Sequence, residues 1–242
     1  MTVLKAAFVF LFIAISTGCM NTSQPQTIVP DAYLFPDSQI GYGKTSVYVI
    51  KNSGDTNYVD FFQKKMNGKT FLIQCDYDKN GISDSMVFLK RRLVEYYINS
   101  LSSGRLWSAN RISGGVRKGM NGQLTEISEV RWQKGSNYAD SKSQTTIIKD
   151  TSLYWNGKSY HAIITRTMID TRSNFLQTPA GDHNFKMEVI TYLCRHLGPV
   201  RRVAIVSWND APIVFDLVEI KDMQHQDRGN QGSSSNDTRT VD

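Results

Sequence analysis

An Asn-Gly pair, Asn156-Gly157, constrains the fold of this chain more than any other short stretch. It lies in LYWNGKSYHAIIT, with apolar and aromatic residues on both sides. A two-residue hairpin turn needs positive φ at both central positions, which Asn and Gly accept readily. The stretch therefore predicts a β-hairpin, and His161 to Ile169 continues it as a long strand.

Several other segments are rich in β-branched and aromatic residues, which favour strands. They are Thr45 to Ile50, Lys69 to Cys75, Arg105 to Ile112, Leu124 to Gln133, Thr145 to Lys149, RRVAIVSW and APIVFDLVEI. The stretch FKMEVITYLCRHL fits a helix face as well as an alternating strand. Its Thr, Tyr, Val and Ile residues favour a strand that turns near Gly198-Pro199.

Two stretches predict helices. In Ser85 to Leu101, one apolar stripe recurs at spacings of three and four: Met86, Leu89, Leu93, Tyr97 and Leu101. Asp84 stands where an N-cap belongs, and Gly104 follows the end. Tyr58 to Met66 is a second, shorter candidate. The predicted fold class is α+β and mainly β, a curved, half-barrel-like antiparallel sheet with one main amphipathic helix.

The first eighteen residues, MTVLKAAFVFLFIAISTG, have the layout of a secretory signal. Lys5 precedes an apolar run from Ala6 to Ile15, and small residues follow. The run is too short for a stable membrane span.

Ser16-Thr17-Gly18-Cys19 then resembles the lipobox of bacterial lipoproteins. In that family the peptidase cuts before the Cys, whose sulfur carries diacylglycerol, so the resemblance implies lipidation of Cys19 and anchoring in the membrane. Ser16 departs from the usual Leu, Val or Ile. The alternative is an ordinary signal peptide cut near Gly18. Because Met20 is not the Asp linked to inner-membrane retention, the resemblance implies the periplasmic side of the outer membrane if the source is Gram-negative.

By composition, the rest of the chain consists of a tether, a domain and a tail. Residues 19–32 are polar, contain two prolines and predict a tether. Residues 33–223 form one predicted β-rich domain. Residues 224–242 contain a single large apolar residue and predict a disordered tail.

A weaker resemblance covers about a quarter of the chain, from Tyr154 to Trp208. It consists of the Asn-Gly-Lys-x-Tyr hairpin and a later element with Tyr192, Gly198 and Val200. This pattern is similar to envelope lipoproteins with strongly curved antiparallel sheets, comparable to Lol-type lipoprotein carriers. The resemblance implies a β-rich envelope fold.

The stretch CDYDKNGISDS carries the candidate metal ligands. The oxygen-bearing side chains are Asp76, Asp78, Asn80 and Asp84. With Gly81 at the sixth position, they match the early half of an EF-hand calcium loop. Val87 stands at position 12, where a bidentate Glu is needed, so any calcium binding should be weak. The alternative is a polar turn in which Asp84 caps the following helix.

Cys75 and Cys194 are the cysteines left if Cys19 is acylated. An oxidising envelope compartment permits a disulfide between them. The alternative is two buried free thiols in separate strands.

The net charge of +6 is modest for a nucleic-acid-binding protein. Cys194 and His196 would point the same way from one strand, which leaves little room for a substrate between a nucleophile and a base. We find no His-Glu-x-x-His and no Gly-x-Ser-x-Gly motif in the sequence. The sequence thus predicts a lipid-anchored, non-catalytic envelope protein without a cofactor, which binds a protein partner or an acyl ligand. Alternatives are an accessory component of a secretion or surface assembly, and an envelope hydrolase.

Overall fold

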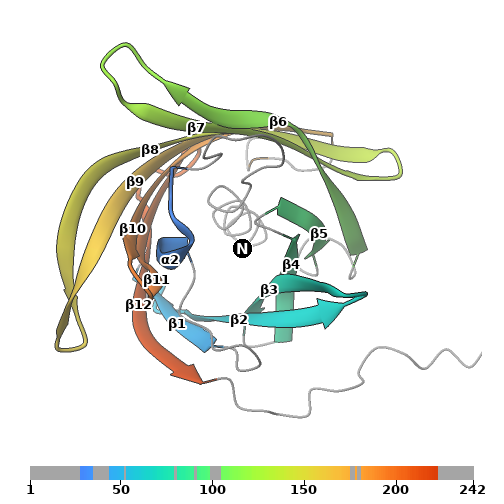
Figure 1. Ribbon diagram of the computed structural model, residues 1–242. Helices are drawn as coiled ribbons and strands as arrows, with labels where there is room; N and C mark the ends of the chain where they lie inside the picture. The colour runs from blue at the N-terminus through green and yellow to red at the C-terminus, as the bar shows by residue number, and fades with distance from the viewer. Residues whose placement is uncertain are drawn as a thin grey trace, which may run out of the picture.

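The structure is a computed structural model (Figure 1). It describes residues 28–34, 44–51, 53–78, 81–89, 92–98, 105–174, 178 and 181–222. Side chains are described for most of these residues. Those of β4, of β5, of residues 105–113 and of a few single positions elsewhere are not described.

Twelve strands in the described part of the chain form a closed antiparallel barrel, in the order β1-β12-β11-β10-β9-β8-β7-β6-β5-β4-β3-β2. Every strand pairs with its neighbours along the chain, and β1 closes the ring on β12 (Figure 1). The strands are β1 Lys44–Ile50, β2 Thr56–Met66, β3 Lys69–Asp78, β4 Gly81–Leu89, β5 Arg92–Ile98, β6 Arg105–Lys118, β7 Leu124–Lys134, β8 Asn137–Trp155, β9 Lys158–Ser173, β10 Asn184–Cys194, β11 Gly198–Val206 and β12 Ile213–Asp222.

This up-and-down order places alternate turns on opposite rims. The chain enters β1 and leaves β12 at one rim, which we call the entry rim. The turns after β2, β6, β8 and β10 lie at the same rim. The turns after β1, β7, β9 and β11 lie at the other rim, which we call the far rim.

The predicted α+β class is wrong, because Ser85 to Leu101 does not form the main helix. β4 and β5 occupy this region instead, and Met86 lies opposite Tyr96 in an antiparallel pair. The helical spacing of the apolar residues is outweighed by backbone pairing, since β3 and β6 hydrogen-bond to the two outer sides of this hairpin. Strand pairing in the full ring therefore decides the conformation.

The shorter predicted helix, Tyr58 to Met66, is wrong for the same reason. Val59 and Phe61 of β2 are buried two residues apart, as on one face of a strand. Asn67 and Gly68 end the strand with φ of 49° and 71°. These values suit a tight turn into β3.

The predicted strands are confirmed, and the half-barrel is in fact a full ring. The hairpin at Asn156-Gly157 joins β8 to β9, with φ of 45° and 79° at the turn. The ambiguous FKMEVITYLCRHL stretch forms β10. Its buried positions alternate from Phe185 to Leu193, as expected for a strand with one packed face.

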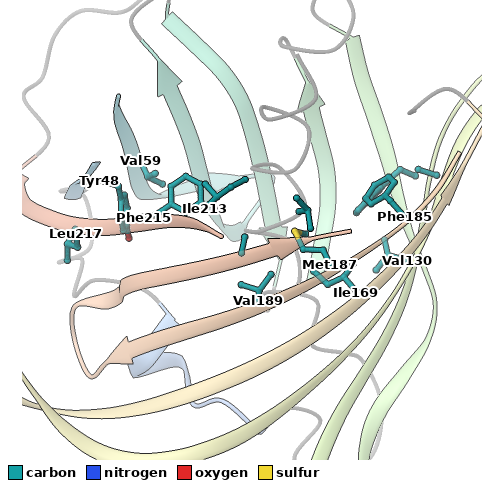
Figure 2. Close-up of a cluster of buried hydrophobic side chains, with 14 of the residues drawn as sticks. Tyr48, Val59, Val130, Ile169, Phe185, Met187, Val189, Ile213, Phe215 and Leu217 are labelled. Atoms are coloured by element: carbon teal, nitrogen blue, oxygen red, sulfur yellow. The ribbon is translucent and has the colours of Figure 1, made fainter. Parts of the chain in front are cut away.

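A cluster of buried apolar side chains lines one side of the barrel wall (Figure 2). It includes Tyr48 and Val59 from β1 and β2, and Met187, Val189 and Phe215 from β10 and β12. Residues far apart in sequence thus share one packed face, which is the main apolar core of the described structure.

One short helix, α2 Asp31–Leu34, is drawn inside the ring, beside β10 and β11 (Figure 1). Val29 and Tyr33, next to and within it, are 2% and 9% exposed, and they pack against Ile163 and Leu193. None of the helices in the described residues is long and apolar enough to span a membrane.

Candidate functional site

The described candidate residues lie in two places, Cys75, Asp76, Asp78 and Asp84 in the β3–β4 hairpin and Cys194 at the end of β10. Cys19 and Asn80 lie outside the described residues. Cys75, in β3, and Cys194, at the end of β10, are buried thiols in separate strands. The disulfide between them stays a prediction. Burial raises the pKa of the Cys194 thiol to about 11, which keeps it protonated and unreactive at neutral pH.

The CDYDKNGISDS stretch is the β3–β4 hairpin. Asp76 lies opposite Asp84, and Asp78 lies opposite Gly81. Asp84 therefore does not cap a helix, since a strand follows Gly81. Within the described residues, no group of three or more His, Cys, Asp and Glu side chains could hold a metal ion. The calcium site stays a prediction.

The calcium candidate Asp76 instead belongs to a buried polar cluster inside the barrel. In-register neighbours on adjacent strands share a face of the sheet. Asp76 lies opposite Val59 of the apolar core, and its neighbour Gln74 donates a hydrogen bond from Nε2 to Asp76 Oδ1 at 3.3 Å. Tyr48 of β1 donates its hydroxyl to the Pro199 carbonyl oxygen at 2.8 Å. These side chains are therefore part of the interior.

A buried arginine supplies the positive charge of this cluster. Arg202 of β11 is 3% exposed and lies opposite Thr191. Burial lowers the pKa of its guanidinium to about 10, although the negative charges of ionised Tyr48 and Asp76 act to raise it. Even at that value, Arg202 stays charged at neutral pH.

Burial dominates the titration of the two acidic groups as well. It raises the pKa of Asp76 to about 7, although Gln74 and Arg202 favour its ionised form. It raises the pKa of Tyr48 to about 12. Asp76 thus changes its charge near neutral pH while it is 0% exposed. A fully buried carboxyl does not reach a substrate in solution, so this geometry favours a structural role.

Hydroxyl side chains line the interior beside this cluster. Thr145 and Thr167 share a hydrogen bond of 3.0 Å between β8 and β9. Thr165 and Thr191 lie opposite each other on β9 and β10, and Thr191 lies opposite Arg202. Among the described residues, the buried hydroxyls of Thr165 and Thr191 have no hydrogen-bond partner. The interior is therefore mixed in polarity, apolar toward β12 and β1 and hydroxyl-rich toward β8 and β9.

Residues 28–34, which include the last five residues of the predicted tether, are bound to the entry rim. The Ile28 amide donates to Glu126 Oε2 at 3.1 Å, and the His196 amide donates to the Ala32 carbonyl oxygen at 2.6 Å. Glu126 lies near the start of β7, and His196 lies in the turn after β10. Residues 28–34 therefore connect separate parts of the rim.

Side chains strengthen this connection. The Tyr33 hydroxyl lies 2.5 Å from His161 Nδ1, and His161 Nε2 lies 3.0 Å from Asp150 Oδ1. The rings of Tyr33 and His161 meet edge to face, with centroids 5.9 Å apart. The chain Tyr33–His161–Asp150 thus ties the docked segment to β9 and β8.

The outer wall carries ion pairs between neighbouring strands. Arg201 binds Asp216 through two hydrogen bonds, of 2.5 and 3.0 Å, and Lys51 approaches the same carboxylate at 3.0 Å. Arg166 holds Glu188 in the same two-bonded way, at 2.8 and 2.9 Å. Large apolar side chains are exposed on this wall too. They include Met168 at 44% and Ile205 at 45%.

No family model matches this chain, and no curated protein matches it. Two solved structures are similar in their chain course. One is a candidate lipoprotein of Parabacteroides distasonis, with 14% identity, 78% of this chain and 98% of that chain covered, and a TM-score of 0.47. The other is a candidate exported protein of Bacteroides fragilis with a YmcC-like fold, with 10% identity, 78% and 99% coverage, and a TM-score of 0.44. At these scores the similarity carries no argument about function.

Sequence reasoning missed the residues of the interior cluster. Tyr48 and Arg202 stand among β-branched and charged neighbours that look like ordinary strand residues. Arg201 and Arg202 are adjacent, yet one lies on the outer wall in an ion pair and the other is buried. Because adjacent residues of a strand face opposite sides of the sheet, the sequence predicts that one of the two Arg residues faces inward. It does not show which of the two does so.

Proposed function

We propose that this chain is a lipid-anchored, non-catalytic protein of the bacterial cell envelope that binds a protein partner. The lipobox-like Ser16-Thr17-Gly18-Cys19 supports the anchor. The observation that carries the proposal is the docking of residues 28–34 into the barrel. Ile28 follows Cys19 by only nine residues. An extended chain of this length spans at most about 32 Å, so acylation of Cys19 holds the whole barrel close to a bilayer.

The interior supports a binding role over catalysis. Asp76 and Arg202, the charged side chains of the interior cluster, are 0% and 3% exposed. A general acid or base must come within hydrogen-bond reach of its substrate, and burial of this degree prevents that. These groups therefore serve the fold.

The same interior favours a protein partner over an acyl ligand. The inner-facing core and hydroxyl residues of the described strands are mostly packed and buried, and a hydroxyl-rich wall suits hydrocarbon poorly. The outer wall, in contrast, exposes Met168 and Ile205. These two flank Glu188 in one row across β9, β10 and β11. Met and Arg are enriched at protein interfaces, so Met168 beside Arg166 on this wall is suited to a protein partner.

Metabolic labelling with a clickable fatty acid tests the anchor. We expect the wild-type chain to carry the label and the Cys19→Ser variant to carry none. The two chains should also separate on fractionation, with the wild type in membranes. Equal labelling of both, or of neither, would contradict the proposal.

Native mass spectrometry tests the choice of ligand. A chain that begins at residue 20 keeps every described residue and cannot be acylated at Cys19. We expect its mass to match the bare polypeptide after purification from cells. A stoichiometric lipid or fatty-acid adduct would favour the acyl ligand instead.

A further inference from the structure

The two rims of the barrel differ in charge. At the entry rim, the exposed basic side chains with described positions are Lys69, Arg117, Lys118, Lys149, Lys158, Arg195 and Lys221. The exposed acidic ones there are Asp150, Glu219 and Asp222. Asp150 binds His161, and Glu219 binds Lys221. The described entry rim is therefore basic.

The far rim is balanced in charge. Asp55, Asp182 and Asp210 are exposed in its described turns, and Lys51, Arg172 and Lys186 are exposed in or beside these turns. Lys51 also binds Asp216. Among the described residues, positive charge is thus concentrated at the rim where the chain enters the barrel.

Large apolar side chains stand exposed at two hairpins of the entry rim. Met120, in the turn after β6, is 109% exposed, and Leu124 beside it is 48% exposed. Tyr154, next to the Asn156-Gly157 turn, is 77% exposed. Each hairpin also carries an exposed lysine, Lys118 or Lys158. Exposed apolar or aromatic tips beside lysines are suited to a membrane surface, where rings enter the interface and cations meet anionic headgroups.

We infer that the entry rim rests on an anionic lipid bilayer and that the tips of the β6–β7 and β8–β9 hairpins enter its interface. This inference rests on the proposed function for its orientation, because the docked segment that follows Cys19 lies at the same rim. The short connection to Cys19 brings the rim to the membrane, and the rim's own residues then bind it. The far rim faces away from the bilayer.

Binding to vesicles without the acyl anchor tests the rim by itself. The chain beginning at residue 20 is mixed with vesicles of phosphatidylethanolamine and phosphatidylglycerol, or of phosphatidylcholine alone, and bound protein is separated by flotation. We expect binding to the anionic vesicles at low salt and its loss at high salt. No binding to anionic vesicles at low salt would overturn the inference.

Rim variants and a control variant locate the binding surface. Lys118→Glu with Lys158→Glu should weaken binding by at least about tenfold, given about 1 kcal/mol per basic residue near an anionic surface. Met120→Ser with Tyr154→Ser should weaken it as well. Lys186→Glu, exposed toward the far rim, is the control and should bind like the wild type. An equal loss in this control would overturn the inference.

Circular dichroism of each variant verifies that the barrel is intact. The vesicle-binding result can be told apart from the test of the lipid anchor, because fatty-acid labelling of Cys19 does not depend on the rim residues. A labelled chain whose rim fails to bind vesicles contradicts only the rim. An unlabelled chain whose rim binds contradicts only the anchor.

Discussion

On the outer and inner faces of the barrel, the pKa of a carboxyl is shifted in opposite directions. On the outer wall, Asp216 accepts bonds from Arg201 and Lys51, and these partners outweigh partial burial and lower its pKa. On the inner face, burial outweighs the hydrogen bond from Gln74 and raises the pKa of Asp76 to about 7. Ion pairing therefore sets the direction of the pKa shift on the outer wall, where water reaches the carboxyl. Desolvation sets that direction in the interior, where water is excluded.

The largest contrast is expected between two adjacent residues of β10. Met187 is 2% exposed inside the barrel, and Glu188 faces outward in its ion pair with Arg166. Met187→Ala should reduce the free energy of unfolding by about 2–5 kcal/mol, through lost burial and the cavity left behind. Glu188→Gln should leave it nearly unchanged. Urea unfolding measures both, and a similar loss in the two variants would show that β10 does not face the way described.

Asp76 should make stability depend on pH in a direction opposite to that of Asp216. Because the folded state raises its pKa from 3.8 to about 7, the folded protein holds a proton that the unfolded chain releases. The contribution of Asp76 to the free energy of unfolding is full below about pH 4 and is lost as the pH rises toward 7. Its size is roughly 1.4 kcal/mol per unit of pKa difference between the folded and unfolded states. Asp76→Asn should flatten this part of the profile.

The measurement is the difference in unfolding free energy between wild type and Asp76→Asn from pH 4 to pH 8. The amide keeps the shape of the carboxyl, so packing is matched. The variant should gain on the wild type as the pH rises. A difference that stays constant with pH would mean that Asp76 titrates as it does in the unfolded chain.

Tyr48 offers a smaller test of the interior. Its hydroxyl donates to the buried Pro199 carbonyl at 2.8 Å. Tyr48→Phe leaves this acceptor without its donor and should cost about 1–3 kcal/mol. Tyr154→Phe is the control, since Tyr154 is 77% exposed and water replaces its hydroxyl bonds. Thermal melting should separate the two, and equal melting temperatures would contradict the buried bond.

Asp216→Asn should have the smallest effect. Its pKa is lowered, so it stabilises the folded state at neutral pH, and that contribution is lost as the pH falls through the acidic range. Arg201 is 43% exposed and screened by water, so we expect a loss of about 0.5–1 kcal/mol at pH 7. The loss should vanish in strong acid, and persistence there would assign it to packing.

The strand content of this fold could be read from local sequence, and the ring could not. The Asn-Gly rule that predicted the turn at Asn156-Gly157 applies equally to Asn67-Gly68, where the structure has the same backbone signs. The same dipeptide recurs at Asn80-Gly81, where Gly81 is the first residue of β4. Applied throughout, the rule favours hairpins over the two predicted helices.

Closure and the interior cluster depend on long-range pairing. β1 meets β12 across most of the chain, with Lys44 opposite Asp222. No local periodicity specifies that contact. The burial of Arg202 beside the exposed Arg201 likewise follows from which face turns inward, and that is known only once the ring is closed.

Depth measurement on the acylated protein in anionic vesicles tests the orientation of the barrel most directly. A nitroxide is placed at Tyr154→Cys on the entry rim or at Lys186→Cys near the far rim. Cys75 and Cys194 are buried, so labelling is confined to the introduced thiol. We expect the label at 154 to be shielded from an aqueous paramagnetic quencher and the label at 186 to be fully accessible to it. Equal aqueous accessibility at the two positions would contradict it.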